Sequence, residues 1–274
     1  MSKTIIIIKN NIRIFVSDFT EIAQKAINIH SKNYLPSLIL AKAIAVFGVL
    51  SFMTQKKNGK TIASITSDGP IKNIIVESNN QGNIRALIGN DNIETEKDDE
   101  INAQIPLILG IGQTGKLKVV HLYNGQQFGS EVILAGADII TDLAYYFDLS
   151  EQIKTAIRDS VQFESKNKIK RAYSAIFQLL PGHTDEDISY IYDFIKTYDI
   201  NKMSLEEYIE AIDGNVLEEK QAQWKCSCSR EKTLEAAKLL PMEEIHEIIE
   251  KYHNVSVECH FCKKSYKFNL EDFK

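Results

Sequence analysis

All four cysteines of this 274-residue chain lie between residues 226 and 262. They form the pattern Cys226-Ser227-Cys228, then 30 intervening residues, then Cys259-His260-Phe261-Cys262. Two close pairs of thiolates, brought together by the chain between them, supply the four sulfur ligands of a tetrahedral Zn²⁺ site. The sequence therefore predicts a zinc site made by the four cysteines, and a purely structural zinc is the commoner use of such a site. Three nearby histidines are further candidate ligands, although four cysteines already fill the shell: His246, His253 and His260.

The spacing within each cysteine pair also permits redox chemistry. Residues i and i+2 of an extended chain have Cα atoms about 6.5 Å apart, near the upper limit for a disulfide, so a bridge within Cys-x-Cys is strained and easily reduced. The Cys-x-x-Cys pair has the spacing of thiol redox motifs. The site is therefore a candidate switch, with thiolates on zinc when reduced and local disulfides without zinc when oxidised. The basic neighbours expected to favour thiolates are Lys225, Arg230, Lys263 and Lys264.

Loss of zinc would have a large effect on the region around the cysteines. A structural zinc contributes about 10–16 kcal/mol of folding free energy. Disulfides that close the short loops within the two pairs contribute only about 1.6 and 1.9 kcal/mol of stability. Because a whole domain is stable by about 5–15 kcal/mol, we expect residues 224–274, a zinc-binding redox-switch domain, to unfold without the metal.

Residues 1–182 predict an α+β core domain. With 44% hydrophobic and 25% charged residues, the chain has the composition of a globular protein. Helical patterns and turn-punctuated β-rich runs occur in blocks, without strict βαβ alternation, so antiparallel sheets packed with helices are expected. An acidic loop is expected at 94–100. The predicted strands are 4–8, 12–16, 61–66, 71–77, 84–88, 117–123, 131–134, 156–163 and 172–179, and the predicted helices are 20–30, 36–53 and 137–147.

Residues 183–223 predict an acidic helical linker. They contain 11 acidic residues and 3 lysines, a net charge of −8. Two short amphipathic helices are expected, one capped by Thr184 and one that begins with the capping box of Ser204 and Glu207. Helices of this length are marginal alone, so their folding depends on another surface. Their predicted apolar stripes are Ile188, Ile191, Tyr192, Ile195 and Tyr198 in the first helix, and Leu205, Tyr208, Ile209 and Ile212 in the second.

Charge and motifs argue against several classes of function. The net charge of −5 gives no basic field for nucleic acid or an anionic membrane, and residues 224–274 carry 9 basic and 9 acidic residues. Gly110-x-Gly112-x-x-Gly115 matches a dinucleotide-binding pattern but precedes a strand-like run instead of a helix, which favours an ordinary loop. Asp138, Asp142 and Asp148 are interpreted as a solvated helix face. No catalytic constellation is predicted, so we do not expect an enzyme.

The longest apolar stretch, residues 38–53, is shorter than the ~20 residues that span a bilayer and predicts a buried helix. The N-terminal apolar run, residues 5–8, is too short for a signal peptide. We therefore expect a cytoplasmic protein.

Beyond the cysteine pattern, several core segments carry a resemblance to a known family: Ser67-Asp68-Gly69-Pro70, residues 74–87, 142–146 and 150–152, and Gln178-Leu179-Leu180-Pro181-Gly182. Along essentially the whole chain the sequence resembles the heat-shock protein 33 family of redox-regulated molecular chaperones. The resemblance implies an ATP-independent holdase that binds unfolding client proteins and is inactive while reduced and zinc-bound.

The same resemblance implies how such a chaperone is activated. Under oxidative stress, disulfides would join Cys226 to Cys228 and Cys259 to Cys262, zinc would be released, and the C-terminal domain and linker would unfold to expose apolar surface. The resemblance also implies a homodimer when oxidised. Neither it nor the charge distribution predicts a nucleic-acid or membrane partner.

Two other classes of function fit parts of the pattern. A zinc-ribbon module that binds RNA or a protein would keep its metal permanently, but the even charge count of residues 224–274 argues against RNA. A thiol–disulfide exchange enzyme usually places Cys-x-x-Cys beside a βαβ unit, which the pattern around Cys259 lacks.

Overall fold

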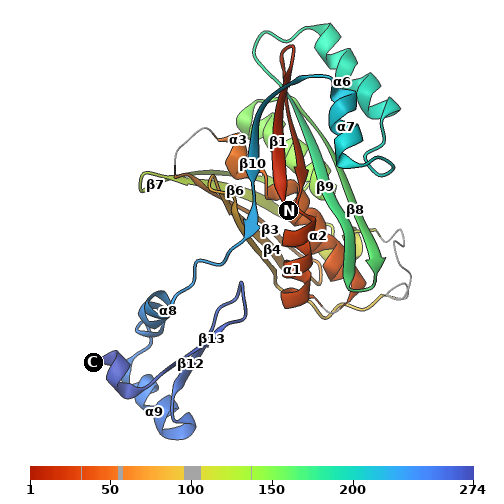
Figure 1. Cartoon of the computed structure of the whole chain (residues 1–274). Helices are drawn as coiled ribbons and strands as arrows, with labels where there is room; N and C mark the ends of the chain where they lie inside the picture. The colour runs from red at the N-terminus through yellow and green to blue at the C-terminus, as the bar shows by residue number, and fades with distance from the viewer. Residues whose placement is uncertain (32, 55–57, 96–105, 137) are drawn as a thin grey trace. The chain divides into compact units, whose positions relative to one another are not determined.

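The computed structural model describes residues 1–31, 33–54, 58–95, 106–136 and 138–274. Within them the chain divides into two units, Met1–Trp224 and Lys225–Lys274 (Figure 1). The larger unit combines two mainly antiparallel sheets with helices, so the predicted α+β class is confirmed. Most of the predicted acidic loop, residues 96–100, and residue 137 of the third predicted helix lie outside the described residues.

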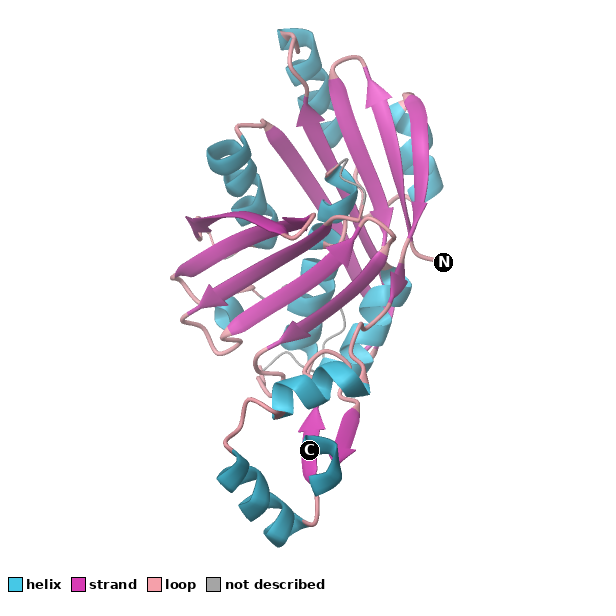
Figure 2. Cartoon of the chain, turned by 90° about the vertical axis from the view of Figure 1, so that its left-hand side faces the viewer, coloured by secondary structure: helices cyan, strands magenta, loops and turns pink. Residues whose placement is uncertain are grey.

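One sheet of the larger unit has five antiparallel strands in the order β10-β1-β2-β9-β8 (Figures 1 and 2). Strands β1 and β2 follow each other in the sequence and pair from Lys3 with Asp18 to Lys9 with Ile12. Asn10, in the turn between them, has a φ of 51°, a left-handed conformation that asparagine tolerates better than most residues. The strands are β1 Lys3–Lys9, β2 Ile12–Asp18, β8 Thr155–Ser165, β9 Lys168–Leu179 and β10 Asn215–Gln221.

The second sheet has six strands in the order β11-β5-β4-β3-β6-β7. Buried and part-buried residues alternate along β3, β4 and β5, as expected for strands with one face on a core. Only β11 pairs in parallel, with β5. The strands are β3 Lys60–Ser67, β4 Asn73–Asn79, β5 Asn83–Ile88, β6 Gly115–Tyr123, β7 Gln126–Ile133 and β11 Gln223–Trp224.

An apolar helix, α2 (Tyr34–Phe47), lies in the main core between the two sheets. It contacts β8 and β9 of one sheet and β4 and β5 of the other. Every residue of α2 except Lys42 is buried, because the helix has apolar or small residues on all sides. The other helical segments before the linker are α1 Thr20–His30, α3 Leu50–Met53, α4 Ile108–Ile111, α5 Ile139–Tyr146 and the π-helical turn Phe147–Glu151.

By length and composition alone, the helical stretch Tyr34–Met53 is apolar enough to cross a membrane. In the folded protein, however, 94% of an 18-residue window of this stretch is buried. A helix enclosed in this way is already covered by protein, which agrees with the predicted buried helix.

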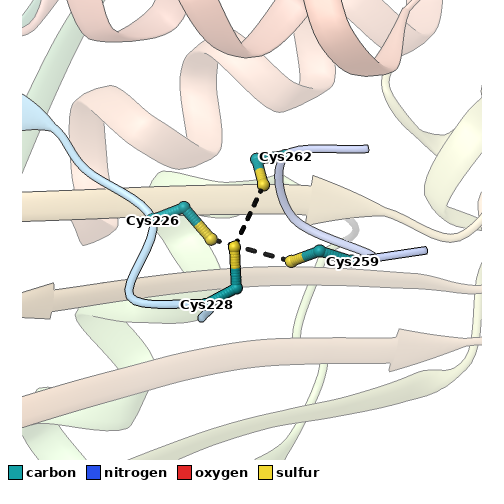
Figure 3. A group of neighbouring side chains, drawn as sticks. All are labelled: Cys226, Cys228, Cys259 and Cys262. Carbon is teal, nitrogen blue, oxygen red and sulfur yellow. Dashed lines mark hydrogen bonds between the residues drawn. The ribbon is translucent and has the colours of Figure 1, made fainter. Parts of the chain in front are cut away.

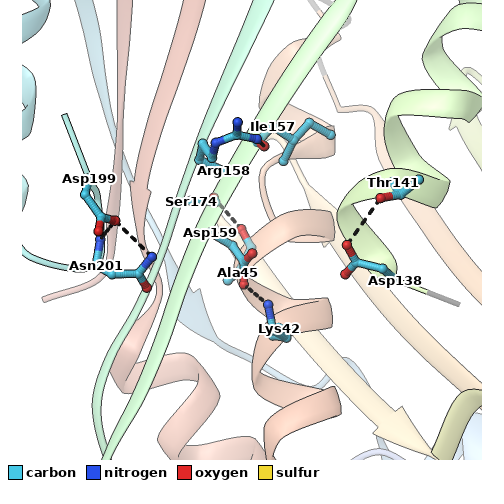
Figure 4. A network of polar contacts seen from close by, with 10 residues as sticks. All are labelled: Lys42, Ala45, Asp138, Thr141, Ile157, Arg158, Asp159, Ser174, Asp199 and Asn201. Atoms are coloured by element: carbon cyan, nitrogen blue, oxygen red, sulfur yellow. Dashed lines mark hydrogen bonds and ion pairs between the residues drawn. The ribbon is translucent and has the colours of Figure 1, made fainter. Parts of the chain in front are cut away.

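The one charged residue of α2 is anchored by an ion pair. Lys42 pairs with Asp159 of β8, whose side chain is only 6% exposed (Figure 4). In the next turn of α2, the carbonyl of Ala45 accepts a 2.5 Å hydrogen bond from Ser174 Oγ of β9. The contacts fix α2 against two neighbouring strands of the five-stranded sheet.

The opposite face of the five-stranded sheet is covered by the two linker helices, α6 (Asp185–Thr197) and α7 (Leu205–Ile212). Both capping boxes are present, the second with a 3.2 Å bond from Glu207 N to Ser204 Oγ. The helices and the sheet share a second apolar core, separate from the main one. Its buried sheet residues are Ile5, Ile7, Ile12, Ile14, Val16, Ala175 and Phe177, and its buried linker residues are Ile191, Phe194, Ile200, Leu205, Tyr208 and Ile212.

The predicted apolar stripe of α6 is partly wrong. Ile188 and Tyr192 are 46% and 67% exposed, whereas Phe194, which was not assigned to the stripe, is 3% exposed. Phe194 packs on Phe177 of β9 and on Tyr208 of α7, with ring centroids 5.6 and 5.2 Å apart. The buried face of α6 is therefore centred closer to Phe194 than the predicted stripe, because this ring fills the space between the sheet and α7. The predicted stripe of α7 is confirmed.

The strand β10 was not predicted. Its sequence, Asn215 to Gln221, is polar and mostly exposed, so it shows none of the apolar alternation that marks a strand. It is a strand because its backbone pairs with β1 across more than 200 residues of sequence, from Lys3 with Gln221 to Ile8 with Asn215.

Two other predictions can be compared with the structure. The glycine-rich segment leads into a strand, as predicted, but only its middle is a loop, since Gly110 lies in α4 and Gly115 begins β6. In this loop Thr114 N donates a 3.0 Å hydrogen bond to Asp68 Oδ1. Asp142, however, is fully buried and does not belong to a solvated face. Its Oδ1 accepts hydrogen bonds from Ala135 N and Gly136 N, at 2.7 and 3.2 Å, while burial raises its pKa.

The Lys42–Asp159 pair generates a stability prediction. Replacing Lys42 by Met leaves the Asp159 carboxylate buried without its partner, so the unfolding free energy should fall by about 3 kcal/mol. The double variant Lys42→Met/Asp159→Leu should recover most of the loss, since no charge remains. Urea unfolding followed by the fluorescence of Trp224, the only tryptophan, measures both. Equal losses in the single and double variants would contradict this account.

Candidate metal and redox centre

The smaller unit places its four cysteines in two loops. Cys226 and Cys228 lie in the extended segment before α8 (Arg230–Ala237), whose N-cap Ser229 accepts a 3.3 Å hydrogen bond from Lys232 N. Cys259 and Cys262 lie between strands β12 (Val255–Glu258) and β13 (Ser265–Phe268). The unit also contains α9 (Met242–Tyr252) and a final 3-10 turn, Leu270–Phe273.

The loop between β12 and β13 is held by its own backbone. Cys259 N donates to the carbonyl of Lys264 at 3.0 Å, and Lys263 N donates to the carbonyl of Cys259 at 2.8 Å. Lys263 has a φ of 57°, in the left-handed region. This tight turn brings both side chains of the Cys-x-x-Cys pair to one side.

The four sulfur atoms point toward one another (Figure 3). Cys226 Sγ lies 3.7 Å from Cys259 Sγ, and Cys228 Sγ lies 3.4 Å from Cys262 Sγ. All four sulfurs are within 4.8 Å of one another, and all four cysteines are free thiols. Thus the structure brings together every cysteine of the predicted site, and none of the three candidate histidines belongs to this cluster of described residues.

The spacing of the sulfurs fits a tetrahedral thiolate site. With Zn–S bonds of about 2.3 Å, the sulfurs of such a site are about 3.8 Å apart, close to the shorter distances given above. Four sulfur donors are a set that favours zinc over harder cations. The residues present therefore fit this metal.

A tyrosine hydrogen bond, which the sequence did not predict, distinguishes one of the thiols. The hydroxyl of Tyr266, on β13, lies 3.2 Å from Cys228 Sγ. Burial disfavours the Cys228 thiolate, but hydrogen bonds from Tyr266 and the other thiols outweigh it and lower the Cys228 pKa to about 7. The pKa of Cys259 is raised, and that of Cys262 is raised to about 12, in both mainly because of burial.

Two of the four basic residues expected to favour the thiolates, Arg230 and Lys263, have other partners. Arg230 donates two 2.8 Å hydrogen bonds to the carboxylate of Asp272 and one of 2.6 Å to the carbonyl of Lys267. Lys263 forms an ion pair with Glu258 at 3.3 Å. Tyr266 was missed because a tyrosine four residues after a cysteine carries no distinctive signal, and only the β12–β13 pairing brings its hydroxyl to Cys228.

The apolar core of the smaller unit is small. Its buried members are Ala237, Ile245, Val255, Tyr266, Phe268 and Phe273. A cluster of this size supplies little of the burial that stabilises a domain, and units of this length commonly depend on a metal or disulfides. The four cysteines are therefore placed where a bound metal can contribute most of the stability.

Comparison with known proteins agrees with the resemblance inferred from the sequence. The family model described as "Hsp33 protein" matches residues 3–269. The 33 kDa chaperonin of Listeria monocytogenes is 30% identical over 274 residues, covering 96% of this chain and 92% of that protein. The 33 kDa chaperonin of Clostridium perfringens is 29% identical, covering 95% of this chain and 86% of that protein.

The fold has a counterpart of known structure. The crystal structure of the 33 kDa chaperonin, a heat shock protein 33 homolog, from Thermotoga maritima superimposes with a TM-score of 0.86 at 24% identity, covering 99% of this chain and 96% of that one. Since a family model matches nearly the whole sequence, the chain belongs to the Hsp33 family of chaperones.

Proposed function

We propose that this chain is a redox-regulated, ATP-independent holdase that binds unfolding client proteins under oxidative stress. The observation that carries the proposal is the cluster of four cysteines, none of them in a disulfide, in a unit with a small apolar core. Membership of the Hsp33 family supports the chaperone activity. The protein performs no catalytic reaction in this proposal; it acts in the cytoplasm, without a nucleic-acid or membrane partner, and dimerises when oxidised.

In the reduced state, the four cysteines are the ligands of the proposed metal. Zn²⁺ bound to them would hold the segment around Cys226 and Cys228 against the β12–β13 loop and keep the four sulfurs as thiolates. The Tyr266 hydroxyl would donate a hydrogen bond to the Cys228 sulfur. This hydrogen bond would reduce the negative charge available on the thiolate for reaction.

Oxidation converts these ligands into groups that no longer bind the metal. A thiolate attacks a hydroperoxide, which loses water or an alcohol and leaves a sulfenic acid; a second thiol then displaces water to form the disulfide. Each disulfide thus takes two electrons from two thiols and consumes one hydroperoxide. Two disulfides remove all four ligands, and the small core of the unit is then insufficient for folding.

We place the disulfides within the local pairs, Cys226 with Cys228 and Cys259 with Cys262. The sulfur contacts of 3.7 and 3.4 Å in the reduced centre run across the pairs, so distance alone does not select this connectivity. Bridges across the pairs would close loops of about 34 residues. Each would lower the conformational entropy of the unfolded unit, which raises its free energy by about 3.8 kcal/mol. Local bridges leave the chain between the pairs free to unfold, which activation requires.

Residues 183–223 transmit the change to the core domain, residues 1–182, in this proposal. Helices α6 and α7 cover apolar residues of the five-stranded sheet, and α6 and α7 are marginal without that contact. The same segment ends at residue 223, three residues before Cys226. When it detaches, the face that contains Ile5, Ile14 and Phe177 becomes a surface for clients, and the net charge of −8 keeps the released segment soluble.

The overall proposal is tested by oxidising the zinc-loaded protein. Peroxide should release about one zinc per chain and produce a form that suppresses aggregation of a denatured reporter protein, whereas the reduced protein should not. Peptide mapping should find mainly the two local disulfides, and Cys259→Ser should bind zinc weakly. Activity with the zinc retained, or mainly cross-pair disulfides, would refute the mechanism.

The docking of the linker gives a second prediction. Phe194→Asp places a charge in the second apolar core, so α6 should detach and chaperone activity should appear in the reduced, zinc-bound protein. Tyr192→Asp is the matched control, because Tyr192 lies on the exposed side of the same helix. Aggregation assays measure activity, and Trp224 fluorescence checks that the larger unit stays folded. If the Phe194 variant remains inactive until oxidised, the linker does not control the client surface.

The hydrogen bond to Cys228 gives a third prediction. Tyr266→Phe keeps the buried ring but removes the hydroxyl, so the Cys228 sulfur should become more reactive and peroxide should release zinc several-fold faster. Tyr252→Phe, at a 60% exposed tyrosine of the same unit, is the control. A colorimetric zinc chelator follows release without any chaperone assay. Equal rates in the wild type and the Tyr266 variant would show that the hydroxyl does not protect the thiolate.

A further inference from the structure

A pocket of about 370 Å³ lies in the larger unit, where the five-stranded sheet approaches the end of α3. This volume is within the usual range for small-molecule sites, about 300–1,000 Å³. Apolar side chains from three parts of the chain form much of its wall: Ile6, Phe15, Phe52 and Leu217. Its other lining residues are polar or charged: Arg13, Thr54, Asn80, Glu218 and Lys220. A cavity that combines an apolar wall with polar groups suits a small organic ligand that has both kinds of surface.

Arg13 enters this pocket with an incompletely satisfied guanidinium. Its Nη2 donates a 2.9 Å hydrogen bond to Gln178 Oε1, and the group lies 5.2 Å from the centre of the Phe15 ring. The buried Nε has no hydrogen-bond partner among the described residues. Burial lowers the pKa of Arg13. The pocket therefore holds a positive charge and a buried donor that an anion would satisfy.

The other charged groups of the pocket offset each other. Lys220 forms an ion pair with Glu218, its neighbour but one on β10. A bulge in the pairing of β1 with β10 makes Leu217 the extra residue, because Ile6 pairs with Glu218 and Ile7 with Val216. Bulges redirect side chains at ligand sites, and here Leu217 and Glu218 both line the pocket. The net charge left for a ligand is that of Arg13.

We propose that this pocket binds a small monocarboxylate with an apolar body. Nε and Nη2 of an arginine form one edge through which a carboxylate binds with two parallel hydrogen bonds. On this edge of Arg13, only Nη2 has a partner. The apolar wall suits a hydrocarbon or aromatic body, and the single uncompensated charge of Arg13 suits a singly charged anion better than a doubly charged one such as phosphate.

The ligand would connect the core domain to the linker segment. Arg13 and Phe15 belong to β2, whereas Leu217, Glu218 and Lys220 belong to β10. A ligand that contacts both strands stabilises the docked form of β10 and hence slows activation, a consequence that rests on the function proposed above. The binding itself is independent of that function.

Binding is tested on the reduced full-length chain by two-dimensional NMR titration, with phenylacetate as the probe. We expect saturable shifts around Arg13 and Leu217, weaker binding of phenylacetamide, which has the same shape without the charge, and no saturation by inorganic phosphate. Arg13→Gln should weaken phenylacetate binding about tenfold or more. Arg158→Gln, at an exposed arginine of β8, removes the same charge elsewhere and should bind as the wild type does.

Equal binding of the acid and its amide would overturn the proposal, and this comparison needs no variant. Saturation of the same residues by phosphate, or unchanged binding in Arg13→Gln, would overturn it as well. Hydrogen exchange of residues 215–221 should slow when phenylacetate is bound, if the ligand ties β10 to β2. These measurements use no oxidant and no client protein. Their outcome is therefore independent of whether the proposed redox switch is correct.

Discussion

The five-stranded sheet has two apolar faces, and both must be covered. In β1, Ile6 faces the main core while Ile5 and Ile7 face the linker helices. The continuous run of isoleucines in this strand is the sequence of a strand buried on both sides. One face is covered by helices of the core domain. The other depends on residues 185–212, which makes a segment that would be marginal alone a necessary part of the folded structure.

The smaller unit has a different source of stability. Its six buried apolar residues supply little hydrophobic stabilisation, while its four thiols converge at distances that suit a tetrahedral metal. In the function proposed above, the stability of this unit depends on the oxidation state of these four sulfur atoms. The linker lies in sequence between the core domain and this unit. This order would allow the proposed redox event to control which apolar surface is exposed.

The sequence predicted what is encoded locally and missed what depends on distant contacts. The cysteine cluster, the capping boxes and most strands of residues 1–182 follow from short spacings and periodicity. The strand β10 could not be predicted, because its polar residues form a strand only by pairing with β1. The rotation of α6 toward Phe194 depends on the rings that face it. Likewise, Tyr266 reaches Cys228 only through the pairing of two strands.

The pairing of β1 with β10 has a consequence for synthesis of the chain. A ribosome extends a chain at about 5–20 residues per second, so β1, β2, β8 and β9 leave it several seconds before α7 and β10 do. During that interval the nascent sheet has no helices over Ile5, Ile14 and Phe177. Each newly made molecule thus passes through a stage in which it exposes the same face that we assign to clients. This stage lasts until α6 and α7 have been synthesised and cover the face.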